Sequence, residues 1–192
     1  MKLVFATQNP GKLREVRELL EPQYEVIGLQ DLENFEEVVE SEPTLEGNAR
    51  LKAHAIWHQY GLSCFSDDTG LEIDALAGKP GVLSARYAGM SKNDDANMKK
   101  VLTKLKGKTD RGAQFRTAIV LLIEGQEYTF EGIVRGHIAQ HKLGKEGFGY
   151  DPIFVPEGFD RSFAQMTAQE KNEISHRGKA IMKLRKFLLE RA

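Results

Sequence analysis

Two adjacent aspartates, Asp67 and Asp68, constrain this chain more than any other feature, because only Ser66 separates them from the short apolar run of residues 62–65. The run is typical of a strand, in which successive side chains point to opposite faces. The two carboxylates therefore face opposite sides and are expected to have different roles. We expect the strand to stop at Ser66, with Gly70 allowing a tight turn that presents the pair.

A carboxylate at the end of a strand suits a hard cation or the activation of an attacking water. Aspartate and glycine are also common in solvated loops, which is the alternative for this segment.

The composition predicts one globular domain without general affinity for nucleic acid. The chain has 192 residues, 41% of them hydrophobic, which suits one domain or one domain with two lobes. Its formal net charge is -1, whereas nucleic-acid binding needs a basic surface. The single cysteine, Cys64, is expected to be a buried, reduced thiol. Because no run is long enough to span a membrane, we expect a cytoplasmic protein.

A polar segment separates a predicted strand, residues 2–6, from a predicted helix, residues 10–20, and reads Thr7-Gln8-Asn9-Pro10-Gly11-Lys12. Asn9 is a good N-cap, and Pro10 suits the first helical position. A strand that leads into a helix N-terminus is also a frequent anion site, to which Thr7 and Lys12 add a hydroxyl and a cation. Phosphate binding and plain helix capping both remain open, although capping alone does not explain Thr7 and Lys12.

Hydrophobic periodicity predicts further elements. Strands are expected at residues 24–29 and 71–75, helices at 44–60 and 94–106, and a hairpin at 115–123 and 126–135. Residues 31–43 are acidic and predicted to be irregular. His54 and His58 are four residues apart, but the zincin glutamate is missing between them, so we do not expect a zinc site.

Two segments near the C-terminus carry further candidates. In residues 147–152, glycines allow a ligand to approach closely and Phe148 is able to stack on a base; the alternative is a tight loop with Phe148 as a core anchor. A capping box at residues 167–170 predicts a helix start, with a break near Ser175. Next, His176 and Arg177 are adjacent donors for a carbonyl or a phosphate, or a surface pair without a role.

Four of these segments resemble, in their order and spacing, the inosine triphosphate pyrophosphatase family. They are Thr-x-Asn-x-x-Lys at residues 7–12, Asp-Asp-Thr-Gly at 67–70, Phe-Gly-Tyr-Asp at 148–151 and Ser-His-Arg at 175–177. The stretch Gly-Lys-Pro-Gly-Val-Leu-Ser-Ala-Arg-Tyr at residues 78–87 is similar to bacterial members. The resemblance covers almost the whole chain.

The resemblance implies an α/β fold with an elongated mixed β-sheet and helices. Two lobes would flank a central nucleotide-binding cleft, within a single catalytic domain of residues 1–192. It implies hydrolysis of the triphosphates of inosine, deoxyinosine and xanthosine to the monophosphate and pyrophosphate, an activity that cleans the nucleotide pool. It further implies Mg²⁺ as cofactor and a homodimer, without nucleic-acid or membrane partners.

The resemblance also assigns roles residue by residue. Asp68 takes the catalytic position and shares the metal with Glu40, although residues 41–44 depart from the usual Glu-Thr-Gly-x-Thr of the family. The substrate contacts that it implies are Thr7, Asn9, Lys12 and Lys171 for the triphosphate, and Phe148, Gly149, Tyr150, Asp151, His176 and Arg177 for the nucleoside and base. Gln8, Pro10, Gly11 and Thr69 are further expected substrate contacts. Further candidates are Lys52, Asp67 and Arg86.

These roles are chemically consistent. Lysines and a helix N-terminus would offset the triphosphate charge, and Asp68 would activate the attacking water. His176 and Arg177 would donate to the 6-oxo group of hypoxanthine or xanthine. Two rival hypotheses are a haloacid-dehalogenase-like phosphatase, whose second aspartate is replaced here by Thr69, and a nucleotide sensor that binds without turnover.

Overall fold

The structure is a computed structural model that describes residues 2–36 and 38–191. The chain divides into two compact units. Unit 1 comprises Met1–Asp68, Thr117–Gly132 and Arg177–Ala192, and unit 2 comprises Thr69–Arg116 and Ile133–His176. Four elements contribute residues to both units: β3 (Cys64–Ile73), β5 (Gly112–Ile123), β6 (Gln126–Ile138) and α5 (His176–Leu189).

The strands follow the order β2-β1-β3-β5-β6-β7, and β4 pairs with β3. In unit 1, β1 (Lys2–Phe5) pairs in parallel with both β2 (Glu25–Gly28) and β3. In unit 2, β3 pairs antiparallel with β4 (Pro80–Gly81), and β6 pairs antiparallel with β7 (Phe154–Pro156). Parallel and antiparallel pairs occur together, so the predicted α/β class with a mixed sheet is confirmed.

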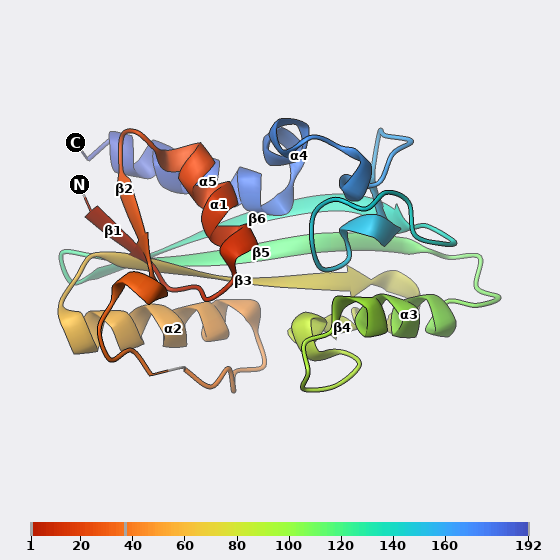
Figure 1. Cartoon of the computed structure of the whole chain (residues 1–192), viewed down its shortest axis with the longest axis horizontal. Coiled ribbons are helices and arrows are strands. Elements are labelled where there is room, and N and C mark those ends of the chain that lie inside the picture. Colours follow the sequence, from red (N-terminus) through yellow and green to blue (C-terminus); the bar gives the residue numbers. More distant parts are fainter. Residues whose placement is uncertain (1, 37, 192) are drawn as a thin grey trace. The chain divides into compact units, whose positions relative to one another are not determined.

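Unit 1 has helices on both sides of its strands. Helices α1 (Pro10–Leu20) and α5 lie on one side, and α2 (Leu45–Tyr60) lies on the other (Figure 1). Each side has its own hydrophobic core. Phe65 stacks on Phe5 in the core under α1 and α5, with 4.6 Å between ring centroids, whereas Cys64 belongs to the core under α2. Because strand side chains alternate, Asp67 shares the face of Phe65 and Asp68 shares the face of Cys64.

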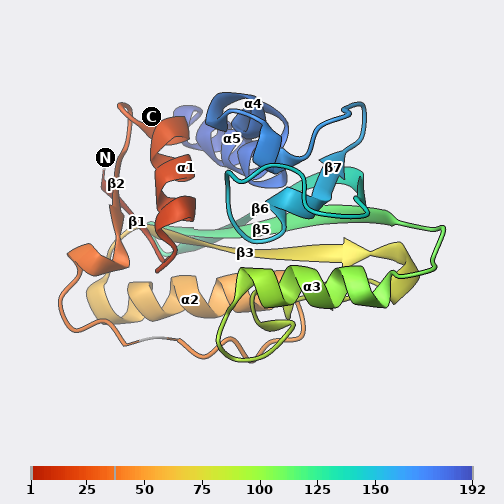
Figure 2. The same ribbon diagram turned by 45° about the vertical axis from the view of Figure 1, so that its right-hand side comes forward.

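Unit 2 is covered by α3 (Asp94–Lys104) on one side of its strands and by α4 (Ala168–Ile174) on the other (Figure 2). Its core is rich in aromatic side chains. Phe115 and Phe154 lie 4.7 Å apart between ring centroids, and Phe163 packs beside them. None of the helices in the described residues is long and apolar enough to cross a membrane.

Most predicted elements agree with the structure. Helix α1 has the predicted bounds, and α2 ends at Tyr60 with Gly61 as its C-cap, whose φ of 64° suits glycine. Thr167 caps α4 through the predicted capping box. Ser175 separates α4 from α5, at the predicted break between the helices. The hairpin turns at Glu124 and Gly125, both with positive φ. The prediction of one catalytic domain with two lobes stays a prediction.

The predicted end of the strand at Ser66 is wrong. Strand β3 continues through Asp67 and Asp68 to Ile73, so Gly70 lies inside a strand and not in a turn. A Cβ on Gly70 would lie 2.8 Å from the carbonyl oxygen of Gly81 in β4. Glycine at this position thus allows the backbone of β4 to approach, and the aspartates are held by a continuous strand.

Candidate functional site

Asp67 faces α1 and α5 and belongs to a buried ion network in unit 1. Its Oδ1 accepts a hydrogen bond from Lys12 Nζ at 2.9 Å, and its Oδ2 accepts one from Arg177 Nε at 3.2 Å. Arg177 Nη1 also donates to Glu15 Oε2 at 2.5 Å. Burial alone would raise the pKa of Asp67, but the charges of Lys12, Arg177 and Lys52 outweigh it and lower the pKa. Its lowered pKa favours the ionised carboxylate, which its two cationic partners stabilise.

Asp68 faces α2 and has different surroundings. Its Oδ2 accepts a hydrogen bond from Asn48 Nδ2 at 3.3 Å, and its Oδ1 lies 3.9 Å from Lys52 Nζ. Burial raises the pKa of Asp68, and the nearby carboxylates of Glu40 and Asp67 add to it; together they outweigh the attraction of the lysines. A carboxylate with a raised pKa in a polar, buried site is suited to accept a proton.

Glu40 and Asp68 have the chemistry of a site for a hard cation. Lys52 Nζ donates to Glu40 Oε1 at 2.8 Å and lies near Asp68, so both carboxylates already contact one positive charge. Mg²⁺ is commonly held by one or two carboxylates together with substrate phosphates. Within residues 2–36 and 38–191, no group of three or more His, Cys, Asp or Glu side chains is arranged to hold a metal ion. Two carboxylates are enough for a cation of this kind only where a phosphate supplies further oxygens.

The segment of residues 7–12 caps α1 as predicted. Asn9 Oδ1 accepts hydrogen bonds from the backbone N–H groups of Gly11 and Lys12 at 2.9 and 3.2 Å. Thr7 Oγ1 accepts from the Asn9 N–H at 3.2 Å, so Thr7 also stabilises the turn. Gln8 and Pro10 are exposed. Capping thus accounts for more of this segment than the sequence indicated, and its contact with phosphate stays a prediction.

Unit 2 brings several nucleoside candidates together around a buried ion pair. Asp151 Oδ2 accepts hydrogen bonds from Lys171 Nζ at 2.8 Å and from the Phe148 N–H at 2.9 Å. The Lys171 ammonium lies 4.6 Å from the centroid of the Phe148 ring, a cation–π contact. Gly147 has a φ of 79°, and a Cβ there would lie 2.2 Å from Asp151 Oδ2. Only glycine allows this loop to close on the carboxylate.

The other predicted site residues of unit 2 have separate surroundings. Tyr150, not Phe148, is the core anchor of the loop: its hydroxyl donates to the Ser84 carbonyl at 2.7 Å. Gly149 N–H donates to Asp94 Oδ2 at 2.7 Å. His176 is buried and stacks on Phe115, with 4.5 Å between ring centroids. Two further candidates, Thr69 and Arg86, are half-buried.

Sequence reasoning missed two buried polar side chains of unit 1, Asn48 and Glu15. Both are buried in their helices, next in the chain to the buried residues Ala49 in α2 and Val16 in α1. A polar residue at such a position needs a partner when buried, which is the signal that points to each. The partners themselves, Asp68 and Arg177, are distant in the sequence.

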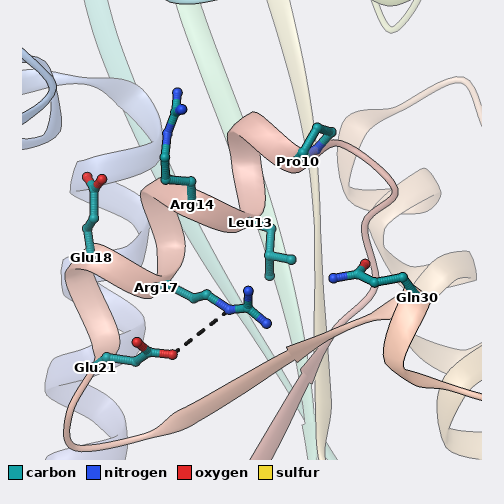
Figure 3. Close-up of a pocket in the computed structure, with 7 residues that line it drawn as sticks. All are labelled: Pro10, Leu13, Arg14, Arg17, Glu18, Glu21 and Gln30. Atoms are coloured by element: carbon teal, nitrogen blue, oxygen red, sulfur yellow. Dashed lines mark ion pairs between the residues drawn. The ribbon is translucent and has the colours of Figure 1, made fainter.

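A shallow hollow of about 480 Å³ runs along α1 in unit 1 (Figure 3). Of the predicted site residues only Pro10 lines it, and the Arg17–Glu21 ion pair, 3.9 Å long, lies at its wall. The hollow is lined by Pro10, Leu13, Arg14, Arg17, Glu18, Glu21 and Gln30. It does not contain the carboxylates of β3.

Comparisons with known proteins cover nearly the whole chain. Residues 3–187 match the model of the Ham1 family. A dITP/XTP pyrophosphatase of Flavobacterium johnsoniae is 50% identical over 184 residues, which is 96% of each chain. One of Christiangramia forsetii is 50% identical over 188 residues, 98% of this chain and 99% of the relative. The solved structure of the Staphylococcus aureus Ham1 protein has a TM-score of 0.91 at 41% identity and covers 100% of both chains.

Proposed function

This chain belongs to the Ham1 family, and from that premise we propose that it hydrolyses noncanonical purine nucleoside triphosphates. The substrates are the triphosphates of deoxyinosine, xanthosine and inosine, and the products are the monophosphate and pyrophosphate. Relatives at 50% identity named dITP/XTP pyrophosphatase support this substrate class, as does the resemblance of four sequence segments.

The observation that carries the proposal is the placement of Asp68. Its carboxylate is buried, has a raised pKa, lies near Lys52, and accepts a hydrogen bond from Asn48 of α2. We propose that Asp68 accepts a proton from the water that attacks the α–β phosphate linkage. An ordinary surface aspartate would be a weaker base and would be less well oriented.

Glu40 and Asp68 would hold a divalent cation, proposed to be Mg²⁺. When bound, Mg²⁺ would neutralise charge on the phosphate oxygens and on the leaving pyrophosphate. Lys12 and Lys52 offset further charge of the triphosphate, and the N-terminus of α1 is suited to the same purpose. Lys171 is proposed to contact the phosphates as well.

The nucleoside is proposed to contact residues 148–151 and the pair His176 and Arg177. Phe148 would stack on the base, and His176 would donate a hydrogen bond to its 6-oxo group. Adenine carries a 6-amino group there and would leave the donor without a partner, which penalises its binding. Arg177 donates through Nε and Nη1 to Asp67 and Glu15, and these contacts hold its guanidinium in place.

A panel of nucleoside triphosphates, assayed with Mg²⁺ for pyrophosphate, tests the proposal. We expect release from dITP, XTP and ITP, and at least tenfold lower kcat/KM for dATP. Release of orthophosphate would instead support a phosphatase, and tight binding without turnover would support a sensor. Either result would contradict the proposed function.

Three further properties belong to the same proposal. The enzyme would require Mg²⁺, act as a homodimer and work in the cytoplasm without nucleic-acid partners. Loss of turnover in a chelator, restored by Mg²⁺, tests the first property. Light scattering coupled to size-exclusion chromatography tests the second, and a monomer at assay concentration would contradict it.

A further inference from the structure

Asn48 is a fully buried side chain in the first turn of α2 and makes three hydrogen bonds to two residues of unit 1. Its Oδ1 accepts a hydrogen bond from the Glu42 N–H at 3.0 Å. Its Nδ2 donates to the Glu42 carbonyl at 3.2 Å and to Asp68 Oδ2 at 3.3 Å. One amide thus joins the segment that follows Glu40 to the carboxylate of Asp68.

The packing around this amide is tight. A Cβ on Gly47 would lie 2.7 Å from the Cβ of Glu42, so the segment rests directly on the first turn of α2. Thr44 caps the helix by accepting from the Gly47 N–H at 3.0 Å. Two residues before Glu42, Glu40 accepts a hydrogen bond from Lys52. The position of Glu40 therefore depends on how its segment is held by Asn48.

We propose that Asn48 is a positioning residue for the hydrolysis, and this inference rests on the proposed function. Its N–H holds Oδ2 of Asp68, which directs Oδ1 toward Lys52. The same side chain holds the segment of Glu40, so one amide sets the arrangement of both carboxylates. An acceptor-only carboxylate needs a donor on this side, and asparagine supplies it without adding charge.

Unit 2 contains a matched control. Asn97 is the fourth residue of α3, as Asn48 is the fourth residue of α2, and both are buried. Asn97 Oδ1 accepts from the Ala88 N–H at 2.6 Å, and its Nδ2 donates to the Ala85 carbonyl at 3.0 Å. It holds a loop to its helix as Asn48 does, but its partners within the described residues are backbone groups. The contact with a carboxylate is what separates the two positions.

Steady-state kinetics with dITP and Mg²⁺ on Asn48→Ala and Asn97→Ala tests the inference. Partners that orient a reacting group are commonly worth about 10–100-fold in activity. We expect Asn48→Ala to lower kcat by that factor while KM for dITP stays within about threefold, the pattern of a transition-state effect. Asn97→Ala should lower the unfolding midpoint but keep kcat within about threefold of the wild type.

A second variant, Asn48→Asp, keeps the shape of the side chain but replaces the donor with an oxygen. We expect it to lose at least as much kcat as Asn48→Ala, because two carboxylates would then face each other. Wild-type kcat in either variant, or an equal loss in Asn97→Ala, would overturn the inference. So would a loss confined to KM.

A readout without turnover comes from urea unfolding of Asn48→Ala, Asp68→Asn and the double variant. Residues in contact give non-additive changes in the free energy of unfolding, so the double variant should differ from the sum of the single ones. Additive changes would overturn the direct contact. A wild type that releases no pyrophosphate from dITP would overturn the proposed function and the inference with it, whereas an active wild type with unaffected Asn48 variants would overturn the inference alone.

Discussion

The two faces of β3 at Asp67 and Asp68 give the same residue type opposite properties. On one face, Asp67 accepts hydrogen bonds from two cations, and its pKa is lowered. On the other, Asp68 accepts a hydrogen bond from an amide, with an ammonium at 3.9 Å, and its pKa is raised. The two residues are adjacent in the chain, so the difference in their pKa values comes from their surroundings. The comparison teaches that two adjacent carboxylates on opposite sides of one strand differ in pKa because their surroundings differ, and only Asp68 has the raised pKa that suits its proposed role as proton acceptor.

The largest difference between the faces should appear in turnover. Asp68→Asn removes the proton acceptor, and general-base catalysis is worth about 10²–10⁴-fold in rate. We expect a loss of that size in pyrophosphate release from dITP, with nucleotide binding retained. Because burial raises the pKa of Asp68, its ionisation opposes folding at neutral pH, so the variant should be at least as stable as the wild type. Near-normal turnover of the variant would contradict the role of Asp68 as proton acceptor.

Stability should show the opposite pattern. Asp67→Asn leaves Lys12 and Arg177 partly uncompensated in a buried site, which costs about 3–5 kcal/mol in the free energy of unfolding. Urea unfolding at neutral pH measures it. Asp74→Asn is the control, because Asp74 pairs with Arg135 at the exposed surface of unit 2 and its loss costs about 0–1 kcal/mol. Equal losses in the two variants would contradict a special role for Asp67.

The pH dependence of stability sharpens the contrast. The folded pKa of Asp67 is lowered below its ordinary value of 3.8, so the unfolded chain binds that proton more tightly. Its stabilisation is present above the unfolded value and is lost as the pH falls toward the folded one. The difference in unfolding free energy between the wild type and Asp67→Asn should thus narrow as the pH falls below about 5. A constant difference would show that the effect of the substitution is not electrostatic.

The smallest effect is expected at Ser66, on the Asp68 face. Its hydroxyl is buried and has no hydrogen-bond partner within the part of the chain that the structure describes. Ser66→Ala removes this desolvated group and should raise the free energy of unfolding by up to about 1 kcal/mol. Ser84→Ala is the control, because Ser84 Oγ accepts from the Leu71 N–H and donates to the Gly81 carbonyl, and its loss should destabilise. Destabilisation of equal size in both variants would contradict the assignment.

Local signals predicted much of the fold. Asn9 and Pro10 gave the start of α1, the capping box gave the start of α4, and the alternation of strand residues placed Asp67 and Asp68 on opposite faces. These features depend on neighbours within four residues.

The features that sequence reasoning missed depend on distant partners. Gly70 suggested a turn, and only the pairing of β3 with β4 explains why glycine lies inside a strand there. Glu15 and Arg177 are 162 positions apart, so no local pattern connects them. The contact of Asn48 with Asp68 arises only because α2 packs on β3, so the sequence around Asn48 does not predict it. The roles of the individual substrate contacts stay predictions for the same reason.

The alternation along β3 has a consequence for how such a chain is able to change. The parallel pairing of Val4 with Cys64 and of Phe5 with Phe65 fixes the frame of the strand. Deletion of Ser66 would move each later side chain of the strand to the other face. Asp68 would then face the cations of α1 and α5. An insertion would do the same. The length of this strand is therefore constrained as strictly as its residue types. It is able to accept substitutions but not insertions or deletions.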